Sequence, residues 1–440
     1  MPSRRNVAKG PRPTARGWGI GLTGTAVLVA AAMTTRVDLL FIGLFLVLLP
    51  LGGMLALAVD RPWLTVTRTF TPDAVAAGDE ASTRLTVRNE RSRPTPFLLW
   101  RDAAQTGLEL PGDATLAPIG EHSLSTRDRS DRVGLHYRIR TRHRGAYEVG
   151  PLLVERVDPF GLAHGRYAIG TRKPLLVTPR VVDLQRGEHD ASKSDGVERE
   201  LLRHSVPSAD ELIAREYRTG DPLRRVHWRA TARHDKLMVR QEEQRSNPQA
   251  WIFFDTERAG RPDHRRAHER NEAFEAGVDL VAALGADLLE SGYVLGIVES
   301  TSPQLFGRAG SARSSAGANT ATYEQPSGQQ QLLAALAAVR QQPRQHYDGA
   351  NVLAGVLHRN AQAVPAFLVL VDGEQRELGA LAALRPFADP AVAFLVGHAR
   401  SCGEALTLAG WTCVPMDSTT RPDQAWREAI ERRYSGADHG

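Results

Sequence analysis

The chain has 440 residues, of which 42% are hydrophobic, 6% aromatic and 24% charged, a balance that excludes disordered and collagen-like proteins. The length is that of two or three folded domains. Lys and Arg number 55 against 50 Asp and Glu, so the net charge of +5 is too small to indicate nucleic-acid binding when no basic tail is present. Cys402 and Cys413 are the two cysteines, which excludes a disulfide framework, and we predict that both are packed thiols.

Two apolar runs without a charged residue, 18–35 and 39–59, lie near the start of the chain. The second run has 21 residues, which at a rise of about 1.5 Å per residue matches a hydrocarbon layer of about 30 Å. Residues 36–38 predict the turn between two transmembrane helices, so 18–59 is expected to be a membrane-spanning hairpin. A secretory signal peptide is the alternative, but no cleavage site precedes the second run.

Basic residues flank this predicted hairpin. Residues 1–17 form a basic leader without an acidic residue, and Arg61 and Arg68 follow the second apolar run. The positive-inside rule therefore predicts that both ends of the hairpin are cytoplasmic. The chain is expected to be a multi-pass protein of the cell membrane, held in the lipid bilayer by two spans, with its bulk in the cytoplasm.

Residues 60–180 predict an antiparallel β-sandwich. Apolar and polar residues alternate in segments separated by Gly, Pro and Asp, as is typical of half-buried strands. These segments are WLTVTRTF (63–70), STRLTVRN (82–89), VGLHYRIRTR (133–142) and PLLVTP (174–179).

Residues 249–440 predict an α/β domain. Continuous apolar strands alternate with amphipathic helical patterns, which indicates a mostly parallel sheet covered on both faces. The range 300–330 is rich in Ser, Gly, Ala and Gln and predicts a flexible surface insertion. The strands are expected at 250–255, 293–299, 366–372, 392–397 and 411–416, and helices near 267–290 and 328–340.

Between the two soluble domains lies the range 181–248, a linker followed by an Arg-rich segment. One interpretation is a binding site for an anionic partner, because Arg holds carboxylate or phosphate groups in a bidentate manner and Trp228 can stack. The other is a structural network in which Glu216 and Asp221 pair with arginines between the domains. The residues of interest are Arg215, Glu216, Tyr217, Gly220, Asp221, Arg224, Arg225, Trp228, Arg229 and Arg233.

Other chemistries receive less support from this segment. Asp221 and His227 offer an acid and a base for a membrane-bound hydrolase with an anionic substrate, but two such residues six positions apart are a weak signal. The segment has no ladder of aromatic residues, which disfavours nucleic-acid binding. The sequence contains no Walker A motif, so we expect no nucleotide pocket and no cofactor.

Three blocks of the sequence resemble the domain of unknown function 58 family, bacterial membrane proteins usually found beside MoxR-type AAA+ ATPases. They are RGAYEVGPLLVERVDPFGL (144–162), LLVTPR (175–180) and REYRTGDPLRRVHWRATARHDKLMVRQ (215–241). The resemblance implies a β-sandwich followed by a von Willebrand factor A-like, Rossmann-like α/β domain. It also implies a role with a MoxR-type ATPase in the assembly or maturation of other proteins. Our first hypothesis is therefore a non-enzymatic, membrane-tethered adaptor or assembly factor that acts on a client protein, and the membrane-bound hydrolase is the alternative.

Von Willebrand factor A domains often bind a divalent metal through Asp-x-Ser-x-Ser, a Thr and a later Asp, all hard oxygen ligands suited to magnesium. In this chain Asp255 and Asp372 stand at the ends of predicted strands. The serine positions hold Glu257 and Ala259, and the threonine position holds Ala350. Because three of the five expected oxygens are replaced, we predict no metal site.

Overall fold

In the computed structural model of the chain, the described residues are 10–122, 130–184, 214–217, 226, 228–234, 236–240, 248–258, 271–305, 320–343, 347–360, 362–372 and 378–437. They form two compact units, Met1–Thr178 and Pro179–Gly440. Each unit has its own buried apolar core. The predicted hairpin and the predicted β domain fall together in the first unit.

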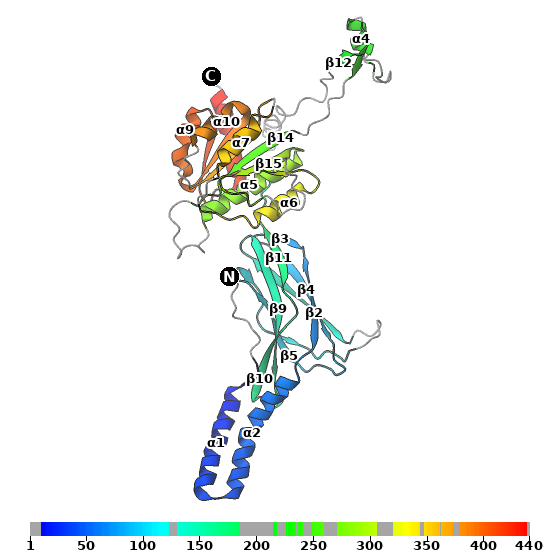
Figure 1. The fold of residues 1–440 in the computed structure, drawn as a ribbon, viewed down its shortest axis with the longest axis vertical. Helices are drawn as coiled ribbons and strands as arrows, with labels where there is room; N and C mark the ends of the chain where they lie inside the picture. Colours follow the sequence, from blue (N-terminus) through cyan, green and yellow to red (C-terminus); the bar gives the residue numbers. More distant parts are fainter. Residues whose placement is uncertain are drawn as a thin grey trace. The chain divides into compact units, whose positions relative to one another are not determined.

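The first unit begins with two long apolar helices, α1 (Ala15–Thr34) and α2 (Val37–Val59), which lie side by side in Figure 1. Thr35 has a left-handed φ of 50° and ends α1, so the turn consists of Thr35 and Arg36. The predicted turn at 36–38 was therefore placed too late, since α2 already includes its last two residues. Both helices are long and apolar enough to cross a membrane, and only 17% and 11% of their apolar windows are buried.

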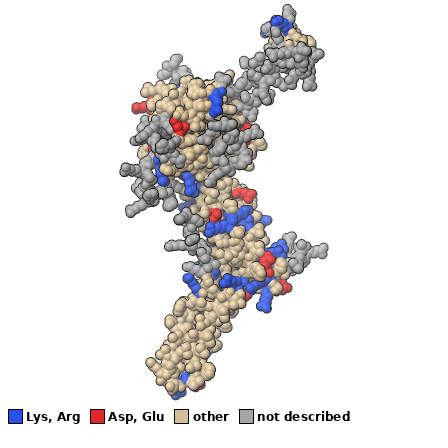
Figure 2. Space-filling model, viewed as in Figure 1, with Lys and Arg blue, Asp and Glu red and all other residues tan. Residues whose placement is uncertain are grey.

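Glycines allow the two helices to approach each other closely. A Cβ atom added to Gly24 would lie 2.8 Å from the Cβ of Leu46, and one added to Gly43 would lie 2.8 Å from the Cγ of Leu28. Small residues at such crossings are typical of helices that associate in lipid. The outward side chains are mostly apolar, and Figure 2 shows this hairpin free of charged side chains except at its turn.

Two sheets complete the first unit. A seven-stranded sheet has the order β1-β10-β9-β11-β3, with β5 pairing β9 and β7, and a four-stranded sheet has the order β2-β4-β8-β6. Side chains from both sheets enter one buried cluster, including Leu85 from the four-stranded sheet and Leu152 from the seven-stranded sheet. The strands are β1 (Arg12–Pro13), β2 (Leu64–Thr71), β3 (Ala74–Ala76), β4 (Glu80–Asn89), β5 (Leu98–Ala104), β6 (Leu108–Glu109), β7 (Ala114–Leu116), β8 (Arg132–Thr141), β9 (Gly145–Val157), β10 (Ala163–Ile169) and β11 (Lys173–Thr178).

A buried polar network connects these two sheets. The guanidinium group of Arg68 on β2 donates to both carboxylate oxygens of Asp102 on β5, with N···O distances of 2.8 and 2.6 Å. The side chains of the two residues are 3% and 1% exposed. Tyr137 on β8 donates its hydroxyl to the same carboxylate, and burial, together with the Asp102 charge, raises the pKa of this phenol. All three side chains are buried, so a group that lost its partner in this network could not form a hydrogen bond to water instead.

The core of the second unit is a six-stranded sheet with the order β16-β15-β14-β17-β18-β19. All neighbouring strands are parallel except β15 and β16, as expected for a mostly parallel sheet. The strands are β14 (Gln249–Phe254), β15 (Val294–Glu299), β16 (Ala321–Tyr323), β17 (Val364–Val371), β18 (Ala388–Val396) and β19 (Thr412–Met416).

Helices cover both faces of this sheet (Figure 1). Successive side chains of one strand point to opposite faces, so Ile252 and Phe254 enter one cluster while Trp251 and Phe253 enter the other. The first cluster includes residues of α5 (Glu272–Glu290), α6 (Gly328–Leu336) and α10 (Pro422–Ala437). The second includes residues of α7 (Gly349–Leu357), α8 (Leu378–Ala382), α9 (Gly403–Leu408) and the 3-10 helix η3 (Gly397–Cys402).

The predicted flexible insertion at 300–330 was too wide. Ser300, Thr301 and Leu305 are buried beside the end of β15, and residues 321–323 form β16. Tyr323 is 1% exposed in the core, which explains why this short segment joins the sheet in spite of its polar surroundings. Residues 306–319 lie outside the described residues. The predicted packed thiols are present as free cysteines, with Cys402 buried and Cys413 half-buried.

Candidate functional site

The carboxyl ends of β14 and β17 mark the point where the strand order of the second unit reverses. In open α/β sheets, ligands bind outside the carboxyl ends of the strands at such a point. Asp255 directly follows β14 and Asp372 directly follows β17. The structure thus places both predicted aspartates at the position where a ligand site is expected.

Asp255 is fully buried and accepts hydrogen bonds from three neighbours. Its Oδ1 accepts from the hydroxyl of Ser300 at 2.8 Å and from the amide of Glu257 at 3.1 Å. Its Oδ2 accepts from the amide of Val371 at 3.2 Å. The carboxylate therefore holds the ends of β14, β15 and β17 together, and its oxygen atoms are occupied by protein donors.

Asp372 has a comparable connecting role. The residue has a left-handed φ of 50°, and its Oδ2 accepts from the side-chain amide of Asn271 at 2.8 Å. Asn271 also caps the start of α5, accepting from two backbone amides of that helix. The Oδ1 of Asp372 accepts from the amide of His398 at 3.0 Å. A Cβ added to Gly397 would lie 2.3 Å from the same oxygen, so only glycine fits there.

A third acidic residue, Glu299, lies at the end of β15 and is 3% exposed. Its Oε2 accepts from the amides of Gln304 and Leu305 at 2.7 and 3.0 Å. Its Oε1 and the hydroxyl of Tyr323 are buried without a hydrogen-bond partner among the described residues. Burial raises the pKa of Glu299 to about 7, against the opposing effect of the two amides. The carboxyl group of Glu299 thus has a raised pKa because it is buried at the edge of the sheet.

The residues at this edge fit a divalent metal poorly. Among the described residues, no three His, Cys, Asp or Glu side chains gather in a way that could hold an ion. Ala350 is fully buried in α7 and has no side-chain oxygen to offer. A metal bound to Asp255 would have to displace the hydrogen bond from Ser300. Ala259 lies outside the described residues.

We therefore keep the prediction that the full chain has no tight magnesium site. Titration calorimetry in detergent is expected to show no saturable heat at submillimolar magnesium, because the available carboxylate oxygens are occupied and two aspartates alone leave the ion mostly hydrated. Asp255→Ala is instead expected to lower stability by about 1–3 kcal/mol, since buried donors lose their acceptor. A stoichiometric magnesium heat that disappears in Asp372→Ala would contradict this prediction.

The Arg-rich segment forms a small β-hairpin with a helix between its strands. β12 (Ala214–Glu216) pairs antiparallel with β13 (Met238–Arg240), and α4 (Trp228–His234) precedes β13. The hydroxyl of Thr231 on α4 accepts from the amide of Met238 at 3.0 Å, which ties the helix to the strand. Arg215 and Glu216 are therefore strand residues, and Tyr217 continues this pairing through its amide, which donates to the carbonyl of Leu237 at 2.8 Å.

Three large side chains of α4 are exposed to solvent. Trp228 is 71% exposed, and Arg229 and Arg233 are also exposed. Residues four apart share one face of a helix, so Arg229 and Arg233 lie on the same side. Several predicted site residues lie outside the described residues: Gly220, Asp221, Arg224, Arg225 and His227. The predicted ion pairs of Asp221 and its pairing with His227 thus stay predictions.

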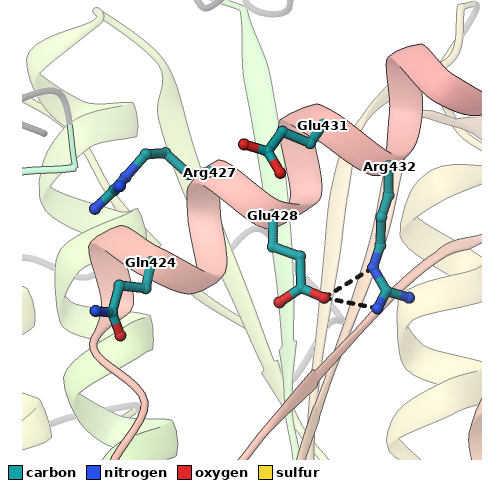
Figure 3. A pocket seen from close by; sticks show the side chains of 5 residues that line it. All are labelled: Gln424, Arg427, Glu428, Glu431 and Arg432. Atoms are coloured by element: carbon teal, nitrogen blue, oxygen red, sulfur yellow. Dashed lines mark hydrogen bonds and ion pairs between the residues drawn. The ribbon is translucent and has the colours of Figure 1, made fainter. Parts of the chain in front are cut away.

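The surface of α10 carries a shallow depression lined by residues of this single helix. Figure 3 shows Glu428 and Arg432 pointing toward each other, and their ion pair has N···O distances of 2.9 and 2.6 Å. The other lining residues, Gln424, Arg427 and Glu431, lie along the same helix. The depression is thus a charged helix surface with an internal ion pair, and in the part of the chain that the structure describes all of its lining residues come from α10.

Sequence reasoning missed the polar residues that surround Asp255. Ser300 and Thr301 were assigned to an insertion, and Glu299 and Thr256 were not singled out. The four residues are buried beside one another, and the hydroxyls of Thr256 and Thr301 are 2.6 Å apart. Their position directly after apolar strands was the available signal, because the carboxyl ends of parallel strands meet at one edge of the sheet.

Comparisons with known proteins found one sequence family. A family model described as "Protein of unknown function DUF58" matches residues 213–363. No curated protein matches the chain.

The solved structures that resemble parts of the chain do so only distantly. The CARDB domain of the PF1109 protein from Pyrococcus furiosus, solved with di-metal ions, is 17% identical over 24% of this chain and 88% of that one, with a TM-score of 0.18. A point mutant of the PilB minor pilin from Streptococcus sanguinis is 8% identical over 87% of this chain and 80% of that one, with a TM-score of 0.27. At these scores neither likeness bears on the fold or the function.

Proposed function

Residues 213–363 belong to the DUF58 family, and from this premise we propose that the protein is a membrane-tethered cytoplasmic adaptor that engages other proteins. In this proposal a MoxR-type AAA+ ATPase is the partner that supplies ATP turnover, and a client protein is matured or assembled. The exposed Trp and Arg side chains of α4 are the observation that carries the proposal, because they lie within the matched segment and are free to meet a partner.

The composition of this surface supports protein binding. Trp and Arg are the residues most enriched at the energetic centres of protein interfaces. Trp228 is 71% exposed although tryptophan is among the most hydrophobic side chains, and burying it against a partner would remove this apolar surface from water. Arg229 and Arg233 would then meet carboxylates of the partner in bidentate pairs.

The arrangement of the second unit supports an A-like domain. Taken in chain order, its strands follow the spatial order 3-2-1-4-5-6, with the third strand antiparallel at one edge. This order is the doubly wound one of dinucleotide-binding folds, and we propose that it here forms the von Willebrand factor A-like domain. In the first unit, we propose that the two sheets with a common core form a sandwich.

The edge of the sheet supports an adaptor rather than an enzyme. The carboxylate oxygens of Asp255 and Asp372 already accept hydrogen bonds from Ser300, Asn271 and backbone amides. A general base needs a free acceptor within hydrogen-bond reach of its substrate. We propose that these side chains shape the loops at the edge and do not act on a substrate.

A retention experiment tests the proposed surface. Membranes holding the tagged full chain or its variants are solubilised in detergent, and the amounts of co-purified ATPase and client are compared by mass spectrometry. Trp228→Ala is expected to lower retention about tenfold or more, the loss typical of a central interface residue. Arg229→Ala with Arg233→Ala is expected to lower retention more at low salt than at physiological salt, because salt already screens the charge attraction of these arginines in the wild-type chain.

Arg359→Ala is the matched control, since Arg359 is an exposed arginine of the second unit outside α4. It is expected to leave retention unchanged. Equal retention by the Trp228 variant and the control would remove α4 from the binding surface. A phosphatase or hydrolase activity that is lost in both Asp221→Ala and His227→Ala would replace the adaptor with the hydrolase alternative.

We further propose that the hairpin spans the cell membrane and that both of its ends are cytoplasmic. The distribution of basic residues around it supports this orientation, with Arg12 and Arg16 before α1 or in its first turn and Arg61 after α2. A cytoplasm-active fluorescent reporter fused to the C-terminus is expected to fluoresce, and a periplasm-active phosphatase fusion to stay inactive. Strong phosphatase activity without fluorescence would show the opposite orientation.

A further inference from the structure

The tip of the β9–β10 hairpin lies beside the helices rather than beyond their ends. Asp158 follows β9, and a Cβ added to Gly53 of α2 would lie 3.2 Å from its Oδ2. Gly53 precedes Val59, the last residue of α2, by six residues, or about 9 Å along the helix axis. On α1, a Cβ added to Gly17 would lie 2.1 Å from the carbonyl oxygen of Leu162. Glycine at both positions thus lets the tip reach past the end of the hairpin.

Hydrogen bonds fix the tip at this depth. Thr14, the residue before α1, donates its amide to the carbonyl of Leu162 at 2.8 Å and its hydroxyl to that of Gly161 at 2.7 Å. Tyr167 on β10 donates its hydroxyl to the carbonyl of Leu57 at 2.6 Å. Arg156 on β9 donates to the carbonyl and carboxylate of Asp60 at 2.7 and 2.6 Å. The sheet is therefore attached to the ends of both helices from several sides.

The length of the helices then places the tip within the membrane boundary. From Val37 to Gly53 the helix rises over 16 residues, or about 24 Å. A hydrocarbon layer is about 30 Å thick. If the turn of the hairpin lies at one boundary, the layer extends about 6 Å past the level of Gly53. Leu55 and Val59 of α2 are 64% and 74% exposed beyond this level, as expected if lipid continues along them.

The tip itself presents apolar side chains. Phe160 is 68% exposed and Val157 is 47% exposed. Asp158 accepts from the amides of Phe160 and Ala163 at 3.1 and 2.5 Å, so a tight turn holds Phe160 outward. On α1, Trp18 is 61% exposed within the first turns of the helix. Aromatic side chains of this kind are enriched where membranes meet water.

Basic side chains accompany the aromatic ones. Arg12, Arg16 and Arg61 are exposed around the ends of the helices, and none of the three forms an ion pair with a described residue. Figure 2 shows Lys and Arg side chains near the junction of the hairpin with the sheets. Anionic lipid headgroups attract such residues by about 1 kcal/mol each.

We propose that the β9–β10 tip is a membrane-docking surface, in which Phe160 and Val157 enter the boundary between headgroups and acyl chains of an anionic bilayer. This proposal rests on the proposed span of the hairpin and adds a second contact that fixes the β domain against the lipid. The attached sheet then moves with the membrane surface as one body with the hairpin. A free tether, by contrast, would let the β domain tumble away from the lipid.

Fluorescent labels on single cysteines test the docking. The full chain, with Cys402→Ala and Cys413→Ala, is labelled with a polarity-sensitive dye at Phe160→Cys, Phe45→Cys or Asp79→Cys and placed in vesicles of phosphatidylcholine and phosphatidylglycerol. Phe45 is 62% exposed in the middle of α2 and reports on the span. Asp79 is an exposed residue before β4, about 30 Å along that strand from the end near the hairpin, and serves as control.

Lipids with a nitroxide near the headgroup are expected to quench roughly half of the emission of the label at 160, because interfacial side chains reach about 5–10 Å into the boundary. The label at 79 is expected to stay unquenched. Val157→Cys provides a second label at the same tip if the Phe160 variant folds poorly. The label at 45 is read with lipids that carry the nitroxide deep in the acyl chain, because this residue lies near the middle of the span. Quenching at 45 by these lipids, with labels at 157 and 160 left unquenched by the headgroup nitroxide, would overturn the docking but leave the span intact. A label at 45 that the deep nitroxide does not quench would overturn both, and blue-shifted but unquenched emission at 160 would show that protein covers the tip instead of lipid.

Discussion

Replacing Asp102 with alanine is expected to lower the free energy of unfolding of the first unit by about 3–5 kcal/mol, the cost of breaking a buried ion pair by removing one partner. The substitution leaves the guanidinium of Arg68, which is 3% exposed, without its bidentate acceptor. It also leaves the hydroxyl of Tyr137 without its acceptor. Hydrogen exchange of peptides from β2, β5 and β8 in the detergent-solubilised full chain measures the effect.

Asp113→Ala is the matched control for this prediction. Asp113 pairs with Arg101 at 3.8 Å, but the two side chains are 63% and 46% exposed. Such surface pairs contribute about 0–1 kcal/mol. A loss below about 1 kcal/mol in Asp102→Ala would show that water or other groups compensate the buried guanidinium. Replacing Arg68, Asp102 and Tyr137 together by Met, Leu and Phe is expected to restore most of the stability, because it removes both buried charges and the phenol hydroxyl and leaves only the carbonyl of Thr171 without the donor it had in Arg68.

The second unit is expected to lose stability as the pH rises from about 5 to about 7, through the titration of Glu299. The folded unit holds its proton up to a pKa of about 7, whereas the unfolded chain releases it near the ordinary value of 4.5. Between these values the folded state binds more protons than the unfolded state, so the free energy of unfolding falls with pH. Below about 4.5 the contribution is complete, and above about 7 the buried carboxylate is charged and the contribution is lost.

Glu299→Gln is expected to abolish this slope and to stabilise the second unit by about 2–3 kcal/mol at pH 8. The glutamine oxygen can still accept from the amides of Gln304 and Leu305. Hydrogen exchange of β14 and β15 across this pH range, corrected for the intrinsic exchange rate, measures the slope. Glu290→Gln, at an exposed position at the end of α5, should leave it unchanged. A wild-type stability that stays constant or rises from pH 5 to pH 7 would contradict the role of Glu299.

Local sequence patterns predicted the two long apolar helices, four strands of the first unit and the longer strands of the second, but not β5, β9 and β10 or the helices α7 to α10. Apolar runs of 18 and 21 residues are longer than the apolar stretches of most buried core helices, so α1 and α2 could be placed to within a few residues. In the six-stranded sheet of the second unit, all strands except β16 were likewise predicted, because fully buried strands are continuous in apolar residues. β16 was missed since three residues are too few to show a period.

The candidate site depended on contacts between distant parts of the chain. Asp255 could be placed at the end of a strand from its neighbours alone, but its donor Ser300 lies 45 residues later and was assigned to an insertion. The Arg-rich segment was recognised from its composition, whereas the outward direction of Trp228 required the small hairpin that holds α4. Periodicity reports whether a side chain is buried, and the order of the strands decides which side chain it meets.

Only the tertiary structure determines which charged side chains are buried inside the β domain and how deep its tip lies along the helices. Arg68 was counted among the cytoplasmic basic residues that follow the second apolar run, yet its strand turns it inward onto Asp102, 34 residues away. The tip at Asp158 meets Gly53 across 105 residues, and no pattern around either residue indicates this contact. A buried ion pair and a close approach at glycine are stable only when the partner surface is present, and that surface exists only once the sheets and helices have packed.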